Sequence, residues 1–164
     1  MTDRAPFYIA AHEAGHAAAH IILNDRLPQP ETKLLSATTA GGGLVKTRVH
    51  RDAPPLNQAA RCLAGFAAEV RFQEGSEGLT ASRDAIVASI AEGRRDQWVD
   101  VQMARAALGH DAGAAAIGRA WDRACGIVQA EWPRVLALAT ELHEQQYMTG
   151  AEIESIWRDA PVQP

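Results

Sequence analysis

The sequence has few cysteines and no strong positive charge. Only Cys62 and Cys125 occur among 164 residues, and both lie far apart in stretches that favour a helix, so a disulfide-stabilised secreted domain is not indicated. Lys and Arg number 16 against 20 Asp and Glu, and the longest basic cluster is Arg94-Arg95. We therefore expect two buried thiols in a reducing, cytoplasmic compartment and no nucleic acid partner.

The sequence also lacks a long, uninterrupted apolar run. Charged residues or imidazoles recur throughout its first 23 residues, and no basic start precedes an apolar segment. We therefore expect neither a signal peptide nor a membrane span. A chain of 164 residues with 47% hydrophobic content suits one globular domain, which we expect to cover residues 1–164.

What the sequence does contain is mostly helical periodicity with one β-rich stretch. Helices are predicted over residues 5–23, 57–73, 83–92, 96–109 and 112–131, after Pro133, and after a capping box formed by Thr149 and Glu152. Thr and Val flank a glycine turn within residues 32–50, which predicts a β-hairpin, whereas residues 74–82 resemble a loop. The fold class is therefore mostly α with one small β-hairpin.

The first predicted helix carries His12, Glu13 and His16 in the sequence His-Glu-Ala-Gly-His. Residues four apart on a helix have Cβ atoms about 5 to 6 Å apart, so the two imidazoles project from the same edge. Such a pair can bind one cation, and zinc is the first choice because a catalytic zinc site takes imidazole nitrogens among its three protein ligands. This composition predicts roughly 0.01 to 0.02 chance occurrences of the pattern, so a metal site explains it better than coincidence.

Glu13 lies on the neighbouring edge of the same helix, where its carboxylate can reach a metal-activated water without binding the metal. We therefore predict that Glu13 is the general base. His20 is one turn beyond His16, but the eight residues from His12 to His20 span about 12 Å along the axis, too far for one ion. We expect His20 to be partly buried or hydrogen-bonded nearby, and a carboxylate to supply the third ligand.

Three segments resemble the peptidase domain of the FtsH-type zinc metalloproteases. They are the His-Glu-Ala-Gly-His motif with the hairpin after it, the segment Leu-Ala-Gly-Phe-Ala-Ala-Glu at residues 63–69, and the C-terminal residues 131–157. The resemblance implies a zincin-like helical metallopeptidase, in which the second motif's helix packs beside the zinc helix and a later aspartate completes the metal site. The chain departs from the family in lacking an ATPase phosphate loop and a membrane span, and Phe66 stands where the pattern usually has arginine.

Two aspartates compete for the third ligand position that the resemblance implies. Asp84 follows Glu69 by 15 residues, close to the family's separation. Asp100 lies on the rim of an apolar stripe that begins at Trp98, so it can turn inward while its helix stays packed. We favour Asp100, keep Asp84 as the alternative, and rank Asp96 third.

These observations predict a zinc metalloendopeptidase that hydrolyses peptide bonds through a metal-activated water, with Zn²⁺ bound by His12, His16 and Asp100. An alternative is a non-catalytic metal-binding module that keeps the fold for regulation or protein interaction. A hydrolase of non-peptide bonds would use the same residues. The substrate is expected to be a polypeptide, which the hairpin could bind by β-augmentation. A homo-oligomer and a separate ATPase partner are both left open.

Overall fold

The computed structural model describes residues 5–24, 32–49 and 52–161, and in this part the protein is mostly helical with a small antiparallel sheet. The helices are α1 (Phe7–Asn24), α2 (Pro55–Ala81), α3 (Arg83–Ala91), α4 (Val99–Leu108), α5 (Ala114–Ala130), α6 (Trp132–Gln145) and α7 (Gly150–Asp159), and the strands are β1 (Thr32–Thr38), β2 (Leu44–Val49) and β3 (Tyr147–Thr149). A short 3-10 turn, Ala40–Gly42, joins β1 to β2. Among the described helices, none is both long and apolar enough to cross a bilayer.

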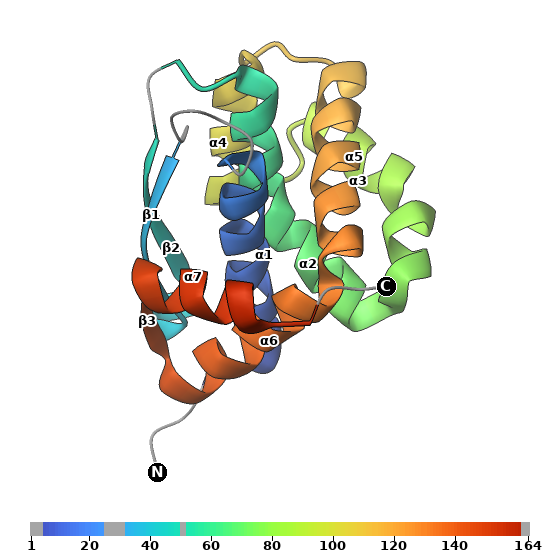
Figure 1. Cartoon of the computed structure of the whole chain (residues 1–164). Helices are drawn as coiled ribbons and strands as arrows, with labels where there is room; N and C mark the ends of the chain where they lie inside the picture. Colours follow the sequence, from blue (N-terminus) through green and yellow to red (C-terminus); the bar gives the residue numbers. More distant parts are fainter. Residues whose placement is uncertain (1–4, 25–31, 50–51, 162–164) are drawn as a thin grey trace.

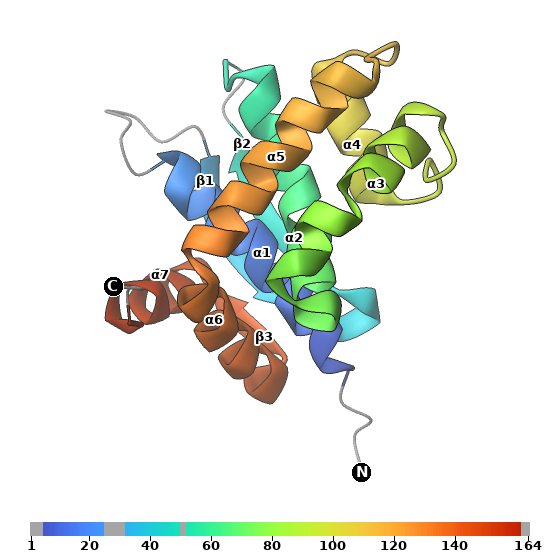
Figure 2. The ribbon, with the colours of Figure 1, turned by 90° about the vertical axis from the view of Figure 1, so that its right-hand side faces the viewer.

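Helix α1 lies at the centre of the fold, with the sheet along one side and the other helices around it (Figure 1 and Figure 2). It packs against α2, α6 and β1, and 11 of its 18 residues are buried. Most of these buried residues are alanines, which let neighbouring elements approach its axis closely. This central position explains why the helix is apolar nearly all round rather than along one stripe.

Helices α1 and α2 approach each other closely. Gly15 of α1 faces α2 so closely that a Cβ atom there would overlap the carbonyl oxygen of Ala64 and the side chain of Ala68. The small residues along this part of α2, which the sequence shows as an unusual concentration, are therefore a packing surface for α1. This contact fixes the distance between the two helices that line the candidate site.

The sheet has the strand order β2-β1-β3, and both pairings are antiparallel. The predicted hairpin is confirmed as β1 and β2, although its predicted last residue, His50, lies outside the described residues. In the described part of the chain β2 pairs with β1 alone, so it is an edge strand. A side chain at Gly150 would overlap the backbone of Leu34, so this glycine lets the start of α7 lie against β1.

The structure corrects two expectations about secondary structure. Residues 74–82 are not a loop, because α2 continues to Ala81 across a break at Gly75, where φ is 76°. Glycine adopts this conformation without the penalty that a Cβ atom brings, and Leu79 beyond the break is buried, which fixes the second segment against the core. The strand β3, of three residues, is also not predicted from the sequence. By contrast, the capping box between Thr149 and Glu152 is present at the start of α7, as predicted.

Candidate metal centre

His12 and His16 lie one turn apart on α1 and turn their rings toward the same point. Their ring centroids are 4.8 Å apart in an edge-on arrangement, and their Nε2 atoms are 3.1 Å apart. The rings fit between the helices because α2 has a glycine, Gly65, directly beneath them. A Cβ atom at Gly65 would overlap both imidazoles. The local sequence of α2 therefore makes the space that the histidine pair occupies.

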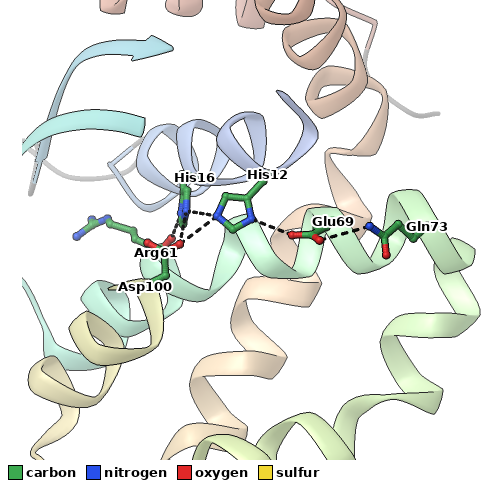
Figure 3. Close-up of polar contacts among 6 residues, drawn as sticks. All are labelled: His12, His16, Arg61, Glu69, Gln73 and Asp100. Carbon is green, nitrogen blue, oxygen red and sulfur yellow. Dashed lines mark hydrogen bonds and ion pairs between the residues drawn. The ribbon is translucent and has the colours of Figure 1, made fainter. Parts of the chain in front are cut away.

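Asp100 enters the same point from α4, as the preferred prediction from the sequence has it. Its Oδ2 atom is 3.0 Å from Nε2 of His12 and 3.3 Å from Nε2 of His16. Figure 3 shows the carboxylate reaching across from α4 to the two rings on α1. In the described part of the chain, His12, His16 and Asp100 form the one cluster of metal-ligating side chains.

The two other aspartates proposed from the sequence lie elsewhere. Asp84 is on α3, where its side chain is 94% exposed and forms an ion pair with the neighbouring Arg83. Asp96 precedes α4 and accepts two hydrogen bonds from Arg105. Neither residue belongs to the cluster, so the geometry favours Asp100 as the third ligand.

The three converging atoms have the spacing that a metal ion requires. A tetrahedral ion with bonds of about 2.1 Å holds its ligand atoms about 3.4 Å apart, and here the separations are 3.0, 3.1 and 3.3 Å. Two imidazole nitrogens and one carboxylate oxygen are also a ligand set that zinc accepts. The residues present therefore fit a zinc ion, with a fourth ligand position left for water or substrate.

The far nitrogens of both rings are held by hydrogen bonds. Nδ1 of His16 lies 2.7 Å from the carbonyl oxygen of Arg61, and since a carbonyl can only accept, the ring nitrogen donates. Nδ1 of His12 lies 3.3 Å from Oε2 of Glu69, which in turn accepts at Oε1 from Gln73 (Figure 3). A proton on each Nδ1 leaves the Nε2 lone pairs for a metal, as in many metal sites where a carboxylate or carbonyl orients a histidine ligand.

The charges around His12 favour a cation where the two Nε2 atoms and the Asp100 carboxylate converge. Burial disfavours the imidazolium form, but hydrogen bonds with Asp100 and Glu69 outweigh this and raise the pKa of His12 to about 9. Asp100 is also partly buried, yet the two histidines lower its pKa well below the ordinary value. The carboxylates that stabilise a positive ring would equally stabilise a divalent ion between the same atoms.

Glu13, the predicted general base, is buried beside the cluster. It is 3% exposed and lies against Gly43, where a Cβ atom would overlap its carboxylate. Its Oε2 atom has no hydrogen-bond partner among the residues that the structure describes. Burial raises the pKa of Glu13, although His16 and His12 act in the opposite direction. A carboxylate with an available acceptor atom and a raised pKa is suited to take a proton from water.

A cleft of about 500 Å³ opens in front of these groups. Its lining includes Glu13, His16 and Asp100, together with Gly43 and the first four residues of the edge strand β2, and Val99, Met103 and Ala107 of α4. Two residues of the cluster, His16 and Asp100, and the predicted base Glu13 thus line one cleft. An edge strand forms one wall of this cleft and a helix forms the opposite wall.

His20 lines the same cleft but is not part of the metal cluster. This agrees with the expectation that His20 lies too far along the helix from His12 to share one ion. It is buried, and burial, followed by the charges of Arg61 and His16, lowers the pKa of His20 to about 3. Cys62 also lines the cleft, and burial raises the pKa of its thiol to about 12. His20 is therefore a neutral hydrogen-bonding group and Cys62 an inert thiol.

Glu69 and Gly65 are the site residues that sequence reasoning missed. Both belong to the second motif, to which the resemblance assigns only a helix that packs beside α1. Their spacing of four residues places them on one face of α2, and this spacing is the signal that could have assigned both to the histidine pair. The sequence matches no protein-family model and no curated protein.

Proposed function

We propose that this chain is a zinc-dependent peptidase that hydrolyses peptide bonds with a metal-activated water. The observation that supports this most strongly is the convergence of Nε2 of His12, Nε2 of His16 and Oδ2 of Asp100, with 3.0 to 3.3 Å between them. Hydrogen bonds at the far nitrogens support it further, because they give both rings the tautomer that binds metal.

When bound, a zinc ion would acidify water and polarise a carbonyl group. His12, His16 and Asp100 would hold it. Glu13 takes a proton from the attacking water and can then pass it to the leaving amine. Its burial keeps bulk water away from the carboxylate, and Gly43 leaves room for its oxygens.

The edge strand supports a polypeptide substrate over other hydrolysable molecules. Backbone groups on the open edge of β2 can hydrogen-bond an extended chain lying in the cleft. Such pairing would hold the substrate backbone beside the cluster without regard to most side chains. We further propose a zincin-like domain that acts in the cytoplasm on flexible or already unfolded chains, either alone or with a separate ATPase.

The test is the substitution Glu13→Gln, with Glu144→Gln on an exposed part of α6 as the matched control. Zinc content is measured by elemental analysis, and cleavage is measured on an unfolded protein such as casein. We expect all forms to bind one zinc ion per chain, and we expect Glu13→Gln to lose activity by about 100-fold or more.

Each other outcome has a distinct meaning. If Glu13→Gln cleaves as fast as the parent, Glu13 is not the base. If the parent binds zinc but cleaves no polypeptide at any zinc loading and stably captures a partner, the non-catalytic metal-binding module is correct instead. If zinc does not bind at all, the proposal fails at its first step.

A further inference from the structure

A second, smaller cavity of about 150 Å³ borders the metal cluster. It shares Asp100 with the main cleft, and its polar side is completed by His12 and Glu69. Of the three candidate metal ligands, His12 and Asp100 line this cavity and His16 and Asp100 line the cleft, so Asp100 borders both spaces. A molecule that lies in the cleft against Asp100 would therefore lie beside this cavity.

The rest of the cavity is apolar. Its lining comes from Leu63 and Phe66 on α2, from Trp98, and from Val101 on α4. Leu63 and Val101 are almost completely buried, whereas Trp98 is 38% exposed. The floor thus belongs to the core, while the indole forms a wall that reaches solvent. A cavity with apolar walls and a few polar groups at one end is typical of a ligand site.

The aromatic wall is held in place by its neighbours. The ring of Phe66 contacts Trp98 edge-on at 5.0 Å between centroids and Trp121 at 5.6 Å. The guanidinium of Arg95 lies over both rings, 5.0 Å from the centroid of Phe66 and 4.6 Å from that of Trp98, and donates a hydrogen bond to Ser89.

We propose that this cavity receives an apolar side chain, aromatic or branched, from the polypeptide in the cleft and thereby selects the bond that is cleaved. This inference rests on the proposed peptidase function. A cavity of about 150 Å³ can hold a benzene ring, so the volume suits the side chain of Phe or Leu. Acidic side chains are disfavoured because Asp100 and Glu69 both border the cavity.

The experiment compares two hydroxamates on the zinc-loaded protein, acetohydroxamate and a hydroxamate that carries a benzyl group. Phenylacetamide, which has the ring without the metal-binding group, is titrated separately and followed by the NMR signal of the Trp98 indole N–H. That signal is assigned by its loss in Trp98→Phe. The variants are Trp98→Ala and the milder Trp98→Leu, with Met103→Ala as control, because Met103 lies on α4 and lines the cleft but not the cavity.

We expect the benzyl compound to bind about tenfold or more tightly than acetohydroxamate, since its ring is buried in the cavity. Trp98→Ala, or Trp98→Leu if the first variant does not fold, should remove most of this difference and leave acetohydroxamate binding unchanged. Met103→Ala should leave the difference intact. In the same samples, peptide cleavage should favour sites next to Phe or Leu.

Equal affinity for the two hydroxamates would overturn the cavity assignment while the peptidase proposal stands. The same conclusion would follow if the difference in affinity persisted in the Trp98 variants and disappeared in Met103→Ala. If neither hydroxamate binds but phenylacetamide shifts the Trp98 signal, the cavity is a binding site for apolar groups and the peptidase proposal fails. If neither hydroxamate binds and the Trp98 signal does not move, both proposals are overturned.

Discussion

Replacing Gly65 by alanine should separate the stability of the protein from its affinity for metal. Gly65 lies in the interior of α2, where alanine is the better helix former. Its missing Cβ atom, however, leaves the space in which the rings of His12 and His16 meet. The substitution should therefore move the two imidazoles apart or tilt them away from Asp100.

The magnitudes can be worked from these contacts. Helix propensity favours Gly65→Ala by about 1 kcal/mol, and an added methyl group in a filled space costs about 1 to 3 kcal/mol. The metal-free protein should thus change by between about zero and 2 kcal/mol of destabilisation. Because the ligand atoms no longer converge, zinc affinity should fall by about 10- to 100-fold, as it does when other groups that orient ligands are removed.

The matched control is Gly126→Ala on α5, an exposed helical glycine with nothing within 4 Å of the added atom. It should stabilise the protein by about 1 kcal/mol and leave zinc binding unchanged. Urea unfolding in the presence of a chelator gives the stability, and competition with a chromophoric chelator gives the affinity. If Gly65→Ala binds zinc as tightly as Gly126→Ala does, the rings do not meet in the way described.

Three further predictions concern the ligands and their surroundings. Asp100→Ala should lose bound zinc in elemental analysis, whereas Asp84→Ala should keep it; the reverse result would restore the alternative ligand. Glu69→Ala should weaken zinc binding by about 10- to 100-fold because the ring of His12 loses its hydrogen bond, and Glu69→Gln, which keeps an acceptor oxygen, should recover part of this in the same competition assay. His20 has its pKa lowered to about 3 by burial, against 6.5 ordinarily, so the unfolded state binds the proton more readily and stability is lost as the pH falls from the higher value to the lower. Urea unfolding of the metal-free protein at about pH 7 and about pH 4 should therefore show a smaller acid sensitivity in His20→Gln than in the parent.

The sequence predicts those parts of the fold that depend on local spacing. Helix positions follow from apolar periodicity, and the start of α7 follows from the capping box at Thr149. The strand β3 is missed because three residues are too few for an alternating pattern to be recognised. They also pair only with β1, which lies more than a hundred residues away in sequence. The continuation of α2 past Gly75 is missed for a related reason, since burial of Leu79 outweighs the glycines and polar residues around it.

The residues of the candidate site also differ in whether local spacing predicts their positions. His12, Glu13 and His16 lie on one helix, so their arrangement is fixed by the helical repeat and can be predicted. Asp100 comes from a different helix, and its position depends on the path of the chain between α3 and α4, which no local pattern specifies. Asp84 matched the expected separation in sequence, yet it points to solvent and pairs with Arg83.

Few side chains of helix α4 are fully buried, so the contacts between Asp100 and the two histidines matter for the position of this helix. Only Val101 and Ala104 of this helix are buried, while Val99 and Met103 are 65% and 54% exposed. Ala107 and Leu108 are only partly buried against the core, so this helix of ten residues gains limited hydrophobic stabilisation. A cation shared between Asp100 and the two histidines would join α4 directly to α1, the most buried helix. Metal binding and the docking of α4 are then parts of one equilibrium, and because α4 also forms a wall of the cleft, the same equilibrium shapes the surface that a substrate meets.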